Sequence, residues 1–347
     1  MKLLLDRTLD RFMNDLRSLY VEAAEAAYLS TDFEEMERLT EIVLKQAKTL
    51  LDKVKVYEVC IQAYWAENKH LEAVKTALRV LNLLGVVFPA QPSLADIMLT
   101  LEETQLVLTG KAPSDLIDLP TMTDPIALAA MQIMTIVWSP AYITVNELIP
   151  LIACKQVNLS VTQGNAPESA FAYANYGLII CGRGQIDTAY QLGQLALHLL
   201  ERFNAKKLKA KIYVFCNFVK HLKEHLRKVL LYKLEAYQSG LETGDFEFAA
   251  GGAMGYCMMS YLSGRELVEL EREQETYNQA IAQLKQEAFL HWHQIFWQVV
   301  LNLIGRSEEP SCLSGEVYDE RKMVPLHLKV TDRTAMLHLY TNKLTLC

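Results

Sequence analysis

A helix-turn-helix pattern recurs along this chain, at residues 26–36, 64–73 and 176–189. Each copy places small and aromatic residues before a polar or glycine-containing turn, and a new apolar stripe follows the turn. Internal repetition of helical pairs is typical of a solenoid, in which each pair buries its apolar face on the next pair. The pattern therefore predicts an all-helical protein that offers an extended surface, and it indicates no chemistry.

The length and composition of the chain fit such a repeat. With 347 residues the chain is longer than a single compact core usually allows, whereas a solenoid grows without enlarging one core. Hydrophobic residues make up 51% and charged residues 22% of the chain, which excludes general disorder. The turns at Thr31 and Asn68 are spaced slightly wider than the tetratricopeptide period of about 34 residues. We therefore expect an all-α, right-handed, tetratricopeptide-like α-solenoid of stacked helical pairs.

The pattern is not uniform along the chain, because proline clusters interrupt it. We divide the chain into five segments: an N-terminal helical lead-in (1–16), tetratricopeptide-like helical pairs (17–92), an irregular helical segment (93–165), a helical-repeat array (166–305), and a loop with a truncated terminal helix (306–347).

Short-range signals predict where several helices begin. Asp32 is placed to cap a helix over 33–50, Ser93 to cap a helix over 94–109, and Asp124 to cap the helix that follows it. Further turns are indicated at the following positions: Ser139-Pro140, Gly164-Asn165, Gly184, Asn204, Gly244-Asp245 and Gly264.

Residues 111–125 contain three prolines together with the apolar side chains Leu116, Ile117 and Leu119. Because these side chains need burial, we expect an ordered loop that packs on its neighbours rather than a linker.

The chain also carries signals about its compartment. The stretch from Pro125 to Asn146 has no formal charge and is long enough to span a bilayer, but Ser139-Pro140 interrupts it, so we interpret it as two buried helices. The seven cysteines form no C-x-x-C pair, and the N-terminus resembles no signal peptide. We expect a cytoplasmic protein that binds no membrane.

Motifs for nucleotide binding and phosphoryl transfer are missing from the sequence. Neither a G-x-x-x-x-G-K-[ST] nor a G-x-G-x-x-G loop occurs, and neither do the H-R-D and D-F-G motifs of protein kinases. We therefore expect a chain that is not itself an enzyme and that needs no cofactor.

The sharpest catalytic alternative is an H-x-x-E-H motif made by His221, Glu224 and His225. On a helix, this spacing would place two imidazoles on one face beside a carboxylate, as a zinc hydrolase requires. The surrounding lysines and arginines oppose metal binding, so we expect that these three residues bind no metal ion. His291 and His293 flank Trp292 two residues apart, which on a helix predicts a partly exposed pair and no site.

A basic stretch offers a second alternative, a nucleic-acid-binding helical array. Its candidate residues for an anionic partner are Lys206, Lys207, Lys209, Lys220, Lys223, Arg227 and Lys228. The net charge of −7 argues against general nucleic-acid binding. We expect a solvated helix face instead, with its counter-charges on a local anionic partner or on the acidic run of residues 266–275.

Aromatic residues on the expected inner helices are candidates for a protein-interaction surface, since solenoids bind partners on their concave face. These residues are Tyr20, Tyr57, Tyr64, Tyr173 and Tyr176. The alternative, which we favour for any single one of them, is packing in the core.

Several longer phrases of the chain resemble one family. They lie at residues 19–30, 50–59, 115–120, 199–211, 236–245 and, more weakly, 331–335. They are similar to the helical middle region of bacterial multi-sensor signalling kinases. In that family a serine/threonine kinase domain, an AAA-type ATPase, a tetratricopeptide-like array, a GAF sensor and a histidine kinase follow one another.

The resemblance implies a non-catalytic interaction and regulatory module of a signal-transduction kinase, either a fragment or a split gene product. Its expected partners are neighbouring kinase, ATPase and sensor domains in cis, or a full-length kinase in trans. The apolar stripe formed by Met336, Leu337, Leu339, Tyr340, Leu344 and Leu346 is also expected to mediate self-association at the C-terminal end.

Overall fold

The computed structural model describes residues 18–28, 30–330 and 332–347, and the regular structure assigned in these ranges is helical. Two isolated bridges, between Thr121 and Asn165 and between Ser314 and Asp319, are the β-type pairings found there. The prediction of an all-α fold is therefore confirmed. The predicted lead-in over residues 1–16 lies outside the described residues.

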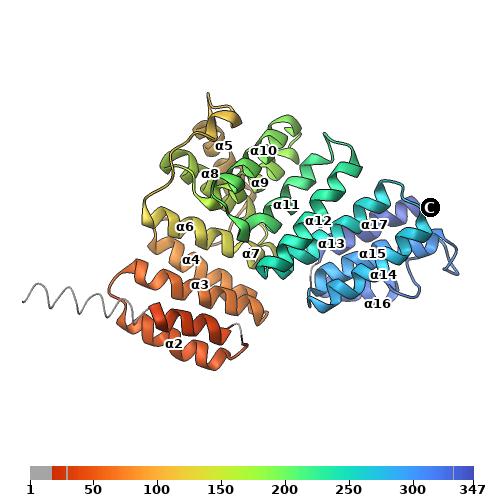
Figure 1. Cartoon of the computed structure of the whole chain (residues 1–347), viewed down its shortest axis with the longest axis horizontal. Helices are drawn as coiled ribbons and strands as arrows, with labels where there is room; N and C mark the ends of the chain where they lie inside the picture. The colour runs from red at the N-terminus through yellow and green to blue at the C-terminus, as the bar shows by residue number, and fades with distance from the viewer. Residues whose placement is uncertain (1–17, 29, 331) are drawn as a thin grey trace, which may run out of the picture. The chain divides into compact units, whose positions relative to one another are not determined.

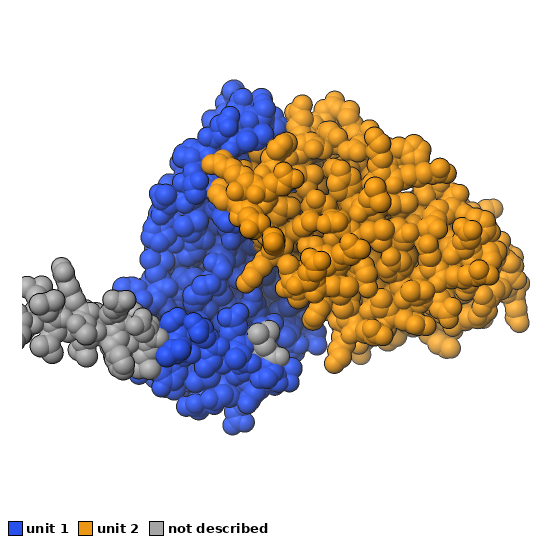
Figure 2. Space-filling model, in the orientation of Figure 1, with its two compact units in different colours: residues 1–176 blue, residues 177–347 orange. Residues whose placement is uncertain are grey.

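The chain consists of two compact units, residues 1–176 and residues 177–347, which Figure 2 shows in separate colours. The border lies inside helix α9 (Pro167–Cys181).

Unit 1 begins its described part with helical residues 18–28. Its further helices are α2 (Phe33–Gln46), α3 (Leu50–Ala66), α4 (His70–Leu83), α5 (Leu94–Leu108), the 3₁₀ helix η1 (Pro113–Leu116), α6 (Pro125–Ile136), α7 (Trp138–Thr144), α8 (Leu148–Gln163) and most of α9. Helix α3 packs on α2, α4 and α6, as Figure 1 shows, whereas α5 packs on the non-sequential helix α8.

Side-chain caps begin the helices where the sequence predicts them. The backbone N–H of Glu35 donates to Asp32 at 3.1 Å, and Ser93 forms a capping box with Asp96 before α5. Asp124 caps α6. Helix α2 ends at Gln46 rather than at the predicted residue 50, because the nearby Thr49 caps α3.

The loop over residues 111–125 is ordered, as predicted. Leu116 is buried, and its carbonyl accepts a hydrogen bond from the side-chain amide of Asn165 at 2.7 Å. Ile117 and Leu119 are half-buried. Gly164 lies so close to this loop, at φ 102°, that an added Cβ would sit 2.4 Å from the Pro120 carbonyl oxygen. Only glycine fits this approach.

Helices α6 and α7 are bent by 46° relative to each other. The break lies at Val137 rather than at the predicted Ser139-Pro140. Pro140 is tolerated inside α7 because it occupies the first turn, where its missing N–H needs no partner. Among the described residues no single helix is long and apolar enough to cross a bilayer, and only this bent pair meets both criteria when taken together.

Unit 2 continues with α10 (Ile186–Arg202), η2 (Lys206–Leu208), α11 (Lys209–Lys220), α12 (Leu226–Thr243), α13 (Phe246–Leu262), α14 (Leu267–Gln283), α15 (Glu287–Leu303), α16 (Glu320–Lys329) and α17 (Arg333–Leu346). From α10 to α15 each helix packs on the next, α13 also packs on α15, and α15 packs on α17. Stacking of this kind is consistent with a helical solenoid. The predicted turns at Gly184, Asn204, Gly244 and Gly264 all have positive φ.

Helices α12 and α13 pack closely in unit 2, because α13 presents glycines to its neighbour. A Cβ added to Gly252 would lie 2.6 Å from the backbone nitrogen of Tyr237. A Cβ added to Gly255 would lie 2.9 Å from the side chain of Lys233, which crosses that glycine. The small residues thus set the distance between the two helices.

Candidate functional site

The H-x-x-E-H residues do not lie on one helix, so the premise of the zinc hypothesis is wrong. His221 follows the last residue of α11, residues 221–224 form a turn, and His225 caps α12. The ring of His225 accepts the Arg227 N–H at 3.2 Å, and Glu224 accepts the Tyr190 hydroxyl at 2.8 Å. Both potential ligands thus have other partners.

Within the described residues no group of three His, Cys, Asp or Glu side chains is arranged to hold a metal ion. His293, predicted to be partly exposed, is instead fully buried, and its Nε2 lies 2.9 Å from the Gln274 carbonyl oxygen. Burial lowers the pKa of His293 to about 4. His293 is therefore neutral at physiological pH and belongs to the packing between α14 and α15.

The predicted basic patch separates into two groups at opposite ends of α11. Lys206 and Lys207 lie in η2, directly before α11, and Lys209 begins α11. Lys220 ends α11, and Lys223 follows it. With a rise of about 1.5 Å per residue, a helix of this length holds the two groups roughly 16 Å apart. Arg227 and Lys228 are exposed at the start of α12.

The counter-charges of these cations are also different from those predicted. Lys209 pairs with Glu235 and Lys223 pairs with Asp187. The acidic run over residues 266–275 serves other cations, since Glu273 pairs with Arg265 and Glu271 pairs with Arg306.

Lys220 is buried and therefore does not belong to a surface patch. Its Nζ lies 3.5 Å from the centre of the Tyr232 ring and 3.8 Å from Glu224. The contact with the ring face stabilises the ammonium group inside the unit.

The five candidate tyrosines differ in how deeply they are buried. Tyr173 and Tyr176 are 0% and 2% exposed, so these two belong to the core and not to the candidate interaction surface. The Tyr173 hydroxyl donates to Asn165 at 3.4 Å. Tyr20, Tyr57 and Tyr64 are half-buried and remain candidates.

The apolar stripe on α17 is likewise divided. Leu339 is buried in a cluster with Ile295 and Val299 of α15, and Leu346 packs on the edge of this cluster. By contrast, Leu337, Tyr340 and Leu344 are exposed at 66%, 55% and 80%. Helix α17 therefore docks on α15 with one side and leaves a second apolar strip uncovered.

A mainly apolar groove of about 500 Å³ lies between α13, α15 and α17. Its walls include Met258 and Leu262 from α13, Phe296 from α15, and Leu337 and Thr341 from α17. Since Leu262 and Leu337 are more than half exposed, apolar surface continues from the groove onto its rim. A concave apolar site of this size suits an inserted side chain or a helix face.

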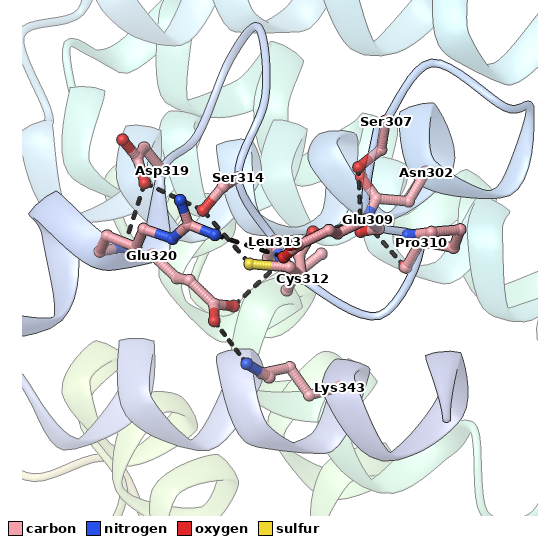
Figure 3. A network of polar contacts seen from close by, with 11 residues as sticks. Asn302, Ser307, Glu309, Pro310, Cys312, Leu313, Ser314, Asp319, Glu320 and Lys343 are labelled. Atoms are coloured by element: carbon pink, nitrogen blue, oxygen red, sulfur yellow. Dashed lines mark hydrogen bonds and ion pairs between the residues drawn. The ribbon is translucent and has the colours of Figure 1, made fainter.

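Polar contacts order the loop between α15 and α16, shown in Figure 3. The side-chain amide of Asn302 donates to the carbonyls of Pro310 and Cys312, at 2.9 and 2.7 Å. Glu320 accepts both the Leu313 N–H and the Lys343 ammonium group. The network ties α15, α16 and α17 into one assembly.

Sequence reasoning did not identify the groove or this network. The apolar residues of the groove come from three helices that are distant along the chain, so no local pattern marks them. Asn302 and Gln298 lie four residues apart on one face of α15, which is the only local signal, and their side chains are joined by a hydrogen bond of 2.9 Å.

Comparison with known proteins relates the chain to signalling kinases. No protein-family model matches it. It is similar to a protein named hybrid signal transduction histidine kinase G, from Dictyostelium discoideum, with 19% identity over 309 residues. The alignment covers 83% of this chain but 9% of that kinase, so the chain spans less than a tenth of its relative.

Proposed function

We propose that the chain is a non-catalytic interaction and regulatory module that works within or beside a signalling histidine kinase. The observation that carries this proposal is the extent of the alignment, because most of the chain matches only a small part of a large signalling kinase. The proposed partners are the kinase, ATPase and sensor domains of the same protein, or a full-length kinase in trans, in the cytoplasm. Binding of nucleic acid or of a membrane is not part of the proposal.

The helical architecture supports this role in physical terms. Stacked helices present long faces to a partner, and unit 2 adds an apolar groove with exposed leucines on its rim. A partner helix that covers Leu262 and Leu337 would remove apolar surface from water, which favours association. Binding on one helix face could then alter the activity of an attached or bound kinase.

The proposal is tested with a histidine kinase from the same organism whose helical region aligns with this chain. Autophosphorylation of that kinase from labelled ATP is measured with and without the purified chain. We expect the rate to change at least twofold at saturation, and we expect no phosphate incorporation or ATP hydrolysis by the chain alone.

Two variants make this experiment specific. Leu262→Glu combined with Leu337→Glu should abolish the effect, whereas Leu106→Glu, at a similarly exposed leucine of α5, should leave it intact. ATP turnover by the chain itself, or an unchanged kinase rate at full occupancy, would contradict the proposal.

A further inference from the structure

The carboxylate of Asp332 joins the last three helices of the chain. It accepts the indole N–H of Trp292, from α15, at 3.0 and 3.2 Å. It also accepts the backbone N–H of Ala335 at 2.9 Å and so caps α17. Its Oδ2 lies 3.5 Å from the Nδ1 of His327, which belongs to α16. This polar junction therefore contributes to the docking of α16 and α17 on α15, together with the apolar cluster around Leu339 and the contacts of Glu320.

Two histidine rings, those of His327 and His338, lie close to this junction. His327 is 2% exposed, and its Nε2 is buried without a hydrogen-bond partner among the described residues. The His338 ring packs edge-on against Trp292 and Phe296, at 6.1 and 5.1 Å between ring centres. The buried place of His327 suits a neutral imidazole far better than a charged one, and the half-buried His338 ring contacts two aromatic rings.

The other titratable groups near the junction do not reverse this balance. His291 of α15 lies 5.8 Å from His327 and would repel its charged form. Tyr318 stacks on His327 at 6.2 Å, and its buried hydroxyl supplies no negative charge at neutral pH. Among the described residues, Asp332 is the one acidic group that acts on both His327 and His338, while Asp319 and Glu320 act on Tyr318.

Burial accordingly dominates at both rings. It lowers the pKa of His338 to about 4 and also lowers the pKa of His327, in each case against the opposing attraction of Asp332. A histidine with a lowered pKa in the docked state binds its proton more readily once it is undocked. Docking is thus fully stable above the ordinary pKa of about 6.5 and weakens as the pH falls from there towards 4.

We propose that α16 and α17 form a proton-sensitive latch, which stays docked on α15 while His327 and His338 are neutral and opens more often when these rings take up protons. Detachment exposes the apolar face of α15 that includes Ile295 and Val299, which are fully buried in the docked state. The latch thereby controls whether this face of unit 2 is accessible.

Hydrogen exchange of the full chain, read by mass spectrometry at pH 7.5 and pH 5.0 and corrected for the intrinsic exchange rate, tests the latch. The ratio of open to docked α16–α17 should rise about 30-fold or more at the lower pH, because one undocked histidine of ordinary pKa contributes about that factor. Helices α6 and α8 of unit 1, whose sequences contain no histidine, should change far less.

The variant His338→Phe keeps an aromatic ring between Trp292 and Phe296 but cannot be protonated, so its response should be smaller, and His327→Phe combined with His338→Phe should lose most of the response. His198→Phe removes an exposed histidine of α10 and should keep it. A response that survives in full in the double variant, or that is absent from the wild type, overturns the latch.

A second measurement needs no substitution. Nuclear magnetic resonance titration of the wild-type chain, labelled at the histidine Cε1 positions, reports the pKa of His338 directly. A pKa below 5 is expected, and a pKa of 6.5 or above would overturn the proposal even if the Phe variant did not fold.

Discussion

The buried side chain of Lys233 destabilises the fold that contains it. It lies in α12 with 1% of its surface exposed, and none of the described carboxylates forms an ion pair with it. Its Nζ lies 4.5 Å from the centre of the Phe218 ring, which offsets only part of the cost of burying a charge. Burial lowers the pKa of Lys233 from 10.5 to about 8.

Replacement of this lysine should stabilise the protein. Lys233→Met keeps the aliphatic chain that crosses Gly255 and removes the charge, so the free energy of unfolding at pH 7 should rise by about 2 kcal/mol. This difference in stability should shrink between pH 8 and 10.5. In that range the wild-type lysine is already neutral in the folded state but still protonated in the unfolded state, so the stability of the wild type rises with pH. Urea unfolding across this pH range measures the effect. The exposed neighbour Lys228→Met is the control and should change stability by less than about 0.5 kcal/mol.

Between elements, the contact of α12 with α13 depends on glycine. The variant Gly252→Ala should destabilise the protein by about 3 kcal/mol, since its Cβ would meet backbone atoms of α12 that cannot move without separating the helices. Gly193→Ala in α10 is the matched control, because its Cβ would meet Cys216 at an ordinary 3.8 Å. This control should be neutral or stabilising by up to about 1 kcal/mol, as expected for alanine in a helix. Equal effects of the two variants in thermal unfolding would refute the role of the close contact.

The loop between α15 and α16 depends on the side chain of Asn302. Asn302→Leu should leave the Pro310 and Cys312 carbonyls and the Gln298 amide without their partner, at a cost of about 2–3 kcal/mol. Limited proteolysis should then cut within residues 304–319 at least ten times faster than in the wild type. Ser307→Ala removes one hydrogen bond of 3.1 Å at an exposed site and should leave the cleavage rate unchanged.

For the whole molecule, the exposed apolar strip of α17, formed by Leu337, Tyr340 and Leu344, predicts self-association. Leu337 and Leu344 are exposed, whereas Leu339 is buried on α15, so only the first two are suited to a contact between copies. We expect the wild-type chain to self-associate with increasing concentration in analytical ultracentrifugation, and Leu337→Glu combined with Leu344→Glu to shift it towards the monomer.

The matched control is the pair Leu106→Glu and Leu231→Glu, at leucines exposed to 75% and 70%. It should not change the distribution of species. A wild-type chain that stays monomeric at high concentration would contradict the prediction. Removal of residues 331–347, in contrast, would uncover Ile295 and Val299 and so would test stability rather than association.

The sequence by itself determined the helical class, the starts of α2, α5 and α6, and the order of the loop at Leu116. These features depend on short-range chemistry, namely a cap and the N–H three residues away, or an apolar side chain in a proline-rich turn. Neither the tetratricopeptide-like nature of the pairs nor their segment limits can be decided from such local signals.

Only the tertiary structure decided which residues are available to a partner. Tyr20 and Tyr173 carry the same side chain at helical spacing, yet the first is half-buried and the second lies in the core. Leu337 and Leu339 are two residues apart and face opposite environments. Burial depends on what a helix packs against, and in unit 2 those contacts come from helices distant along the chain. The groove and the Asp332 junction therefore form only when α13, α15, α16 and α17 are brought together.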